Sequence, residues 1–303
     1  MPRLSHGSTI TSESLLTARA KLAELAAELP LGFAVAAPAD LKDFDFMFPA
    51  LQDDPGNLLP EDRATRDALV ELGIAMLDPA KGHSDPGGDS SIPAAYTYLG
   101  QFIDHDITLE TTSAGLDELL DPELRPLQPG NIRGVLRNAR TASLDLDSVY
   151  GAPAPMDGHE MRVGRVTPRN GTSEPFLRPA GKDDFNDLPR EPRAQVMSRD
   201  RAALTGDPRN DENTIISQLH TAFLRSHNAL VRQGHGYDAA RRLLRQHYQW
   251  IVLHDFLPRI ADPEVVRRVL ADGNRFFVPD QDGFFMPLEF TVAAYRFGHS
   301  MVR

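Results

Sequence analysis

Apolar residues recur every three or four positions in several stretches of the chain, a spacing that places them along one face of an α-helix. The pattern is clearest from Ile92 to Ile107, where it runs through Tyr96, Leu99 and Ile103. The same spacing predicts further helices over residues 12–29, 61–76, 214–231, 239–260 and 287–299. A short helix is expected between Asp262-Pro263, a typical cap and first residue, and Gly273.

Other regions lack this periodicity. Residues 33–60 are rich in Phe, Pro and Asp, residues 82–89 are typical of a loop, and residues 121–193 are dense in Pro, Gly and charge with only short apolar runs. The alternation of polar and apolar residues that predicts strands is scarce. We therefore expect a mainly α fold with long irregular loops and little sheet.

The composition is that of a folded globular protein. With 303 residues, 41% hydrophobic and 25% charged, the chain can bury a sizeable core in one or two domains. Its net charge of −11 disfavours binding to nucleic acid. Because there is no Cys, disulfides, Cys nucleophiles and iron–sulfur clusters are excluded, and any metal must be held by His, Asp or Glu.

The sequence has no recognisable signal for export or membrane insertion. No apolar run approaches the ~18 residues of a membrane span, and the N-terminus lacks the order of charged and apolar residues of a signal peptide. We expect a cytoplasmic protein without a membrane span, with export by a leaderless route left open.

One segment of the helix predicted over residues 92–107 is unusually polar. Residues 100–106 read Gly-Gln-Phe-Ile-Asp-His-Asp, and Gln101 and His105 lie one turn apart on one face. His105 falls near the edge of the buried face, where a partly desolvated imidazole could act as a neutral base. The Asp-His-Asp run is also compatible with a solvated helix end.

A second polar segment could hold a cation. If residues 141–147 are extended, four oxygen-bearing side chains point to one side, because successive residues of a strand alternate faces. These are Thr141, Ser143, Asp145 and Asp147. Calcium favours six to eight oxygen ligands of this kind. The alternative interpretation is a polar loop edge with solvated carboxylates.

Two further segments hold candidate residues. Arg209 and Glu212 lie at the entrance of the helix predicted over residues 214–231, where Asn210 or Asp211 could be the N-cap. His299 lies on the last predicted helix, where a lone His is usually a satisfied core residue.

A minor alternative comes from two His-Asp pairs. His105-Asp106 and His254-Asp255 both fall on predicted helices. Such pairs could serve a metal phosphohydrolase, although the dipeptide is too short to be specific.

Taken in chain order, these segments resemble the animal-type haem peroxidases of the peroxidase–cyclooxygenase superfamily, which has bacterial members. The resemblance runs from about Tyr98 to the end of the chain. It rests on residues 100–106, 141–151, 206–212, 219–228 and 295–299. It implies a haem-peroxidase-like helical core in residues 91–303, with residues 1–90 as a helical and irregular N-terminal region.

The resemblance implies a catalytic role for three residues. His105 would be the distal acid and base that moves the proton of peroxide, and Gln101 and Arg209 would assist it. The expected activity is reduction of H₂O₂ with oxidation of a halide, thiocyanate or small aromatic donor.

Three other residues would hold haem b. His299 would be the proximal ligand of the iron, and Asp104 and Glu212 would form ester links to haem methyl groups. Some members have a Met bonded to haem after this Glu; here the residue is Asn213, so that link is not expected.

The resemblance also implies a Ca²⁺ site. Its ligands would be Asp106, Thr141, Ser143, Asp145 and Asp147. Ser143 stands where the family often has Phe, and Asp147 where it often has Ser, so the site would carry one more negative charge.

Alternatives within the superfamily remain open. Fatty-acid dioxygenases place a radical-forming Tyr three residues before the proximal His; here that residue is Arg296, and Tyr295 is four before, which favours a peroxidase. The chain ends at Arg303, four residues after His299, whereas related proteins continue. We therefore expect a missing C-terminal segment or a partner chain, and a non-enzymatic, calcium-stabilised helical fragment is a further hypothesis.

Overall fold

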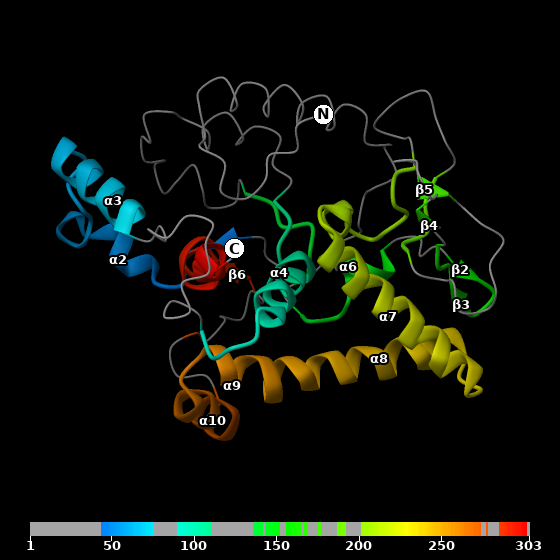
Figure 1. Ribbon diagram of the computed structural model, residues 1–303. Coiled ribbons are helices and arrows are strands. Elements are labelled where there is room, and N and C mark those ends of the chain that lie inside the picture. Colours follow the sequence, from blue (N-terminus) through cyan, green and yellow to red (C-terminus); the bar gives the residue numbers. More distant parts are fainter. Residues whose placement is uncertain are drawn as a thin grey trace.

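The computed structural model describes residues 44–75, 90–110, 136–141, 143–151, 156–164, 167–168, 175–176, 187–191, 201–273, 277 and 285–301. These residues form a mainly helical fold with little sheet, as predicted (Figure 1). The α-helices are α2 (Pro49–Asp53), α3 (Arg63–Ala75), α4 (Ala95–Ile107), α6 (Asp147–Tyr150), α7 (Thr214–Arg232), α8 (Tyr237–Ile251), α9 (Leu257–Ile260) and α10 (Pro263–Asp272).

The remaining elements are short. The 3-10 helices are η1 (Pro55–Asn57), η3 (Pro208–Asp211) and η6 (Tyr295–Met301), and the π-helices are η4 (Val252–Phe256) and η5 (Phe290–Ala294). Two antiparallel pairs join β2 (Met156–Asp157) to β3 (Glu160–Met161) and β4 (Thr167–Pro168) to β5 (Pro175–Phe176). A parallel pair joins β1 (Phe44–Asp45) to β6 (Met286–Pro287). Among the described residues, no helix is long and apolar enough to span a bilayer.

Most of the predicted helices are confirmed. The predictions over residues 61–76, 92–107 and 214–231 correspond to α3, α4 and α7, and the helix over 239–260 is built from α8 and α9 joined by the π-turn η4. Asp262 caps α10 by accepting from the amides of Glu264 and Val265, and Gly273 follows its end with a φ of 79°. The helix predicted over 12–29 and the loop over 82–89 lie outside the described residues.

Two local predictions differ from the structure. The cap of α7 is Asn213, whose side chain accepts from the amide of Ile216, so the prediction of Asn210 or Asp211 is wrong. The reason is that residues 208–211 form the separate turn η3, capped by Asp207, and the α-helix begins only after it. The last predicted helix is helical, but it is built from η5 and η6 instead of a regular α-helix.

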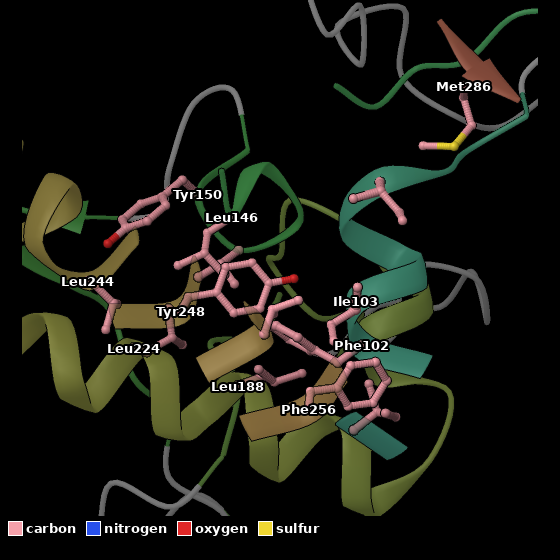
Figure 2. Packing of buried hydrophobic residues seen from close by; sticks show 14 of the residues in the cluster. Phe102, Ile103, Leu146, Tyr150, Leu188, Leu224, Leu244, Tyr248, Phe256 and Met286 are labelled. Carbon is pink, nitrogen blue, oxygen red and sulfur yellow. The ribbon is translucent and has the colours of Figure 1, made fainter. Parts of the chain in front are cut away.

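The core lies where α4, α7 and α8 pack together (Figure 2). Phe102 of α4 stacks on Phe223 of α7 with a centroid distance of 4.8 Å, and Tyr248 of α8 meets both rings edge-on. Offset and edge-on aromatic pairs are favoured by the ring quadrupole and add to the gain from burial. This packing fixes the buried face of α4, and therefore also the direction of its polar residues.

Two glycines bring the segment around α6 against the turn before η3. A Cβ atom on Gly206 would lie 2.4 Å from the carbonyl oxygen of Asp147, and one on Gly151, which has a φ of 55°, would lie 2.7 Å from the Cα of Gly206. Only glycine permits so close an approach of two backbones. The approach places residues 141–147 beside residues 206–212, two of the segments that the sequence analysis selected.

The first described residues meet the last helical segment. In addition to the β1–β6 pair, the Glu289 carboxylate accepts from the backbone amide of Met47 at 2.8 Å. Figure 1 shows the C-terminal segment (red) beside α4, and the two are in contact. This contact brings residues 295–299 to the polar half of α4.

Candidate active site

The polar end of α4 is buried. Asp104, His105 and Asp106 have relative exposures of 6%, 4% and 0%. A buried charged group is costly unless it is paired, so each of these side chains needs partners. The interpretation of Asp-His-Asp as a solvated helix end is therefore wrong, because the fold covers this end with residues 136–141, 143–151 and 205–212.

His105 is held by an amide. Its Nδ1 lies 2.9 Å from Oδ1 of Asn210 on η3. Burial and the neighbouring Arg209 guanidinium lower the pKa of His105 to about 4. The imidazole is therefore neutral at neutral pH and can accept a proton.

Arg209 and Arg140 share one buried carboxylate. Asp207 is fully buried; it accepts from Nη2 of Arg140 at 2.6 Å and from Nη2 of Arg209 at 2.7 Å. Burial opposes its ionisation, but the two guanidinium groups prevail and lower the pKa of Asp207 to about 2. Arg209 also donates to the carbonyl oxygens of Thr108 and His105, at 2.5 Å and 3.2 Å, and so fastens η3 to the C-terminal end of α4.

The two carboxylates predicted to form haem esters are engaged by side chains. Asp104 accepts from Nη1 of Arg296 at 2.5 Å and from the Thr108 hydroxyl at 2.8 Å. Glu212 is exposed and accepts from the side-chain amide of Gln101. An ester at either position requires the carboxylate to be released from these partners.

Three carboxylates, one of them from α4, lie close together. One oxygen each of Asp106, Asp145 and Asp147 lies within 4.8 Å of the others. The Asp106 carboxylate accepts from the backbone amides of Leu146 and Ser148, at 3.1 Å and 3.3 Å. Three of the five predicted Ca²⁺ ligands are thus brought together, although Asp147 begins α6 and the described residues 141 and 143–147 do not form a strand.

The chemistry of this acidic cluster fits a cation. Burial, reinforced by the charge of Asp145, raises the pKa of Asp106 to about 7, and burial raises that of Asp147 to about 8. Oδ1 of Asp147 and the Ser148 hydroxyl are buried without a hydrogen-bond partner. A hard cation would favour the charged carboxylates and supply the missing partner.

The other two predicted ligands, Thr141 and Ser143, have fewer contacts that link them to the acidic cluster. The Thr141 hydroxyl donates to Asp145 at 2.8 Å, at the edge of the cluster. Ser143 is exposed in the same loop. Thr141 is therefore adjacent to the carboxylates, and for Ser143 the structure gives no contact that points to the ion.

A pocket lies on the other side of α4. Its polar lining residues include Gln101 and Asp104 of α4 and His299 of η6, and its apolar wall includes Phe256 and Ile260. Among the described residues that line this pocket, neither His105 nor Arg209 is present. The fold thus brings together side chains almost 200 positions apart in the chain, one of them an exposed imidazole.

The phosphohydrolase interpretation gains no support. His254 is exposed, and the Asp255 carboxylate is taken by the Tyr96 hydroxyl at 2.6 Å and by Arg259 at 2.9 Å. In the described part of the chain, the only group of three or more His, Asp or Glu suited to share an ion is the acidic cluster.

Comparison with known proteins decides between the families. The sequence profile of the family described as "Animal haem peroxidase" matches residues 128–303, more than half of the chain. The chain belongs to the animal haem peroxidase family. This match confirms the family and includes the motifs at residues 141–151, 206–212, 219–228 and 295–299, whereas residues 100–106 precede the matched range. The family implies haem as cofactor.

Named relatives agree with this assignment. A "Peroxidase-like protein" of Margaritifera margaritifera is 28% identical over 85% of this chain and 37% of its own length. Human "Thyroid peroxidase" is 28% identical over 54% of this chain and 19% of its own, and "Chorion peroxidase" of Aedes aegypti is 32% identical over 32% and 14%. The chain therefore spans well under half the length of these relatives.

The pocket suits a haem group in its chemistry. Its lining includes an imidazole from η6, a carboxylate and an amide from α4, and apolar side chains such as Phe256 and Ile260, which are the kinds of donor and surroundings that a haem iron and macrocycle require. Sequence reasoning missed the residues that support these groups, namely Arg140, Asp207, Asn210 and Arg296. Asp207 gave a signal, since it stands two residues before Arg209 and next to Pro208, where a cap is common, and Asn210 was considered only as a possible N-cap.

Proposed function

We propose that this chain is a haem-dependent peroxidase that reduces H₂O₂ and oxidises a halide, thiocyanate or small aromatic donor. The observation that supports this best is the pocket that joins Gln101 and Asp104 of α4 to His299 of η6. Family membership gives the cofactor, and the positions of these residues give the two sides from which it would be held.

His299 would ligate the haem iron, and Asp104 and Glu212 would hold the macrocycle, through esters if these form. When bound, ferric haem supplies the centre at which peroxide is reduced and from which the donor is oxidised. The ion pair of Asp104 with Arg296 and the bond of Glu212 with Gln101 keep both carboxylates ordered beforehand.

His105 would act as the acid and base. His105 is 4% exposed and does not line the pocket in this structure, so peroxide must first gain access to its ring. The neutral imidazole would then take the proton of peroxide and return it to the leaving oxygen, a role that typically contributes about 10²- to 10⁴-fold. The Gln101 amide would donate a hydrogen bond where negative charge develops. Arg209 could assist in the same way once its guanidinium releases the carbonyl oxygens that it holds in this structure.

Calcium in the acidic cluster would support the base. Asp106 is the residue after His105 and is fully buried, so an ion bound to it fixes the end of α4 against residues 141–147. Loss of the ion is expected to displace His105, because a buried carboxylate without its cation favours protonation and rearrangement.

The substitution His105→Ala tests this assignment by stopped-flow spectroscopy of the haem-loaded protein with H₂O₂. We expect the fast reaction with peroxide to be lost while the haem absorption remains. His254→Ala is the matched control, since it removes an exposed imidazole far along the chain. An unchanged rate in His105→Ala would refute His105 as the base, and a wild-type protein that binds calcium but never reacts with peroxide would favour the non-enzymatic fragment.

A further inference from the structure

Asn210 lies between two buried histidines. It is itself fully buried, and His105 and His220 have exposures of 4% and 1%. Its Oδ1 is 2.9 Å from Nδ1 of His105, and its Nδ2 is 2.9 Å from Nδ1 of His220 on α7. One amide therefore links the proposed acid–base residue to a second imidazole in the core.

One contact with a backbone carbonyl favours one direction of this amide. Nδ2 of Asn210 also donates to the carbonyl oxygen of Ser148, at 3.4 Å. A carbonyl oxygen only accepts, so the amide nitrogen must lie on this side and the amide oxygen must face His105. Reversing the amide would place two acceptors against each other at Ser148.

The direction of the amide determines both tautomers. Because Oδ1 only accepts, Nδ1 of His105 must carry the proton, which leaves Nε2 as the unprotonated nitrogen. Because Nδ2 only donates, Nδ1 of His220 must be unprotonated, and its proton is on Nε2. Nε2 of His220 is buried without a hydrogen-bond partner. The hydrogen bond from Asn210 to Nδ1 of His220 must therefore offset the free-energy cost of this unpaired donor.

We propose that Asn210 is a positioning residue that holds His105 in the Nδ1-protonated tautomer and so presents Nε2 as the base. An acid–base imidazole works only with an unprotonated nitrogen at the reacting group, and a mixture of tautomers wastes part of the population. The inference deepens the proposed function and rests on it for its catalytic meaning. The assignment of the two tautomers does not depend on whether the protein binds haem.

The test is long-range ¹H–¹⁵N NMR of the histidine side chains in the full chain with calcium and without haem. Such spectra distinguish a protonated ring nitrogen from an unprotonated one, and His105→Ala and His220→Phe assign the signals. In the wild type we expect His105 protonated at Nδ1 and His220 at Nε2. The opposite tautomer of His105 would overturn the proposal without any variant.

Three variants separate positioning from stability. Asn210→Leu removes the acceptor and should give His105 a mixture of tautomers, whereas Asn210→Asp keeps an acceptor and should preserve the Nδ1-protonated form. Leu188→Ala removes side-chain volume at a fully buried position. Because a leucine side chain forms no hydrogen bond, this variant should leave the tautomer of His105 unchanged. An unaltered tautomer in Asn210→Leu, or an equal change in Leu188→Ala, would contradict positioning by Asn210.

The rate gives a second readout. In the haem-loaded protein, Asn210→Leu should slow the reaction with H₂O₂ by about 10- to 100-fold, the range typical for removing a group that orients a functional imidazole. Asn210→Asp should recover most of this loss. If the tautomers agree with the proposal but the wild type does not react with peroxide, the proposed function fails while the assignment of Asn210 stands.

Discussion

Replacing Asp207 by Asn removes the charge that two arginines share. Asp207 is fully buried, and the side chain of Arg140 is 1% exposed, so the substitution removes the nearer counter-ion of a buried guanidinium and leaves only the Asp147 carboxylate, at 3.7 Å. Removing one partner of a buried ion pair typically costs about 3–5 kcal/mol. For a chain of this length, that corresponds to a fall in Tm of roughly 6–10 °C, at about 2 °C per kcal/mol.

The pKa of Asp207 gives a second figure. The shift from 3.8 to about 2 corresponds to roughly 2–3 kcal/mol, at about 1.4 kcal/mol for each pKa unit. The larger range includes the cost of leaving the buried Arg140 guanidinium with only the more distant Asp147 carboxylate, so the two figures are compatible. Because the pKa is lower in the folded protein, this contribution is present above about pH 4 and is lost as the pH falls through about 2.

Urea unfolding of Asp207→Asn and of the wild type at several pH values measures this effect. The difference in unfolding free energy should be constant between about pH 5 and 8 and should shrink below about pH 4. Asp211→Asn is the matched control, because it makes the same change in the same turn at a partly exposed pair with Arg190, where about 0–1 kcal/mol is expected. Equal losses in the two variants, or a difference that grows in acid, would refute the reasoning.

Further predictions concern the ion and the haem links. Chelation with EGTA should lower Tm, because calcium binds only the folded state and stabilises it by about 2.7 kcal/mol when its concentration is a hundred times Kd. Asp145→Asn should abolish this sensitivity. A Tm unaffected by EGTA in the wild type would count against the acidic cluster as a calcium site. Asp104→Val and Glu212→Gln should each release more haem to acidic organic solvent than the wild type does, as measured by absorbance of the extract. Equal and complete extraction from all three proteins would show that no ester forms.

The helices of this fold were predictable because their apolar residues repeat at three and four. The stripe of residues 92–107 placed Gln101 and His105 on α4, and the cap at Asp262 and the stop at Gly273 matched the structure. Periodicity reports which face is buried, but it does not report the local turns that long-range contacts impose. The turn η3 therefore displaced the expected cap of α7 from Asn210 or Asp211 to Asn213.

The candidate site was predictable in its reacting groups but not in their supports. Asp145 and Asp147 were predictable from the alternation of oxygen-bearing residues, and Asp106 was added only by the family resemblance; the fold brings these three carboxylates together. Arg140, Asp207 and Asn210 act through partners 35 to 105 positions away, and no local pattern encodes such pairs. The domain boundary at residue 90, the ester links and the cytoplasmic location stay predictions.

The central claim is that this chain builds a working haem site, and the visible absorption spectrum tests it most directly. Haemin is added to the purified calcium-loaded protein, followed by H₂O₂, with His299→Ala as the control. We predict a Soret band that saturates with haemin, shifts with peroxide and is lost or altered in His299→Ala. A spectrum identical to that of free haemin, from a protein that calcium still stabilises, would contradict the claim.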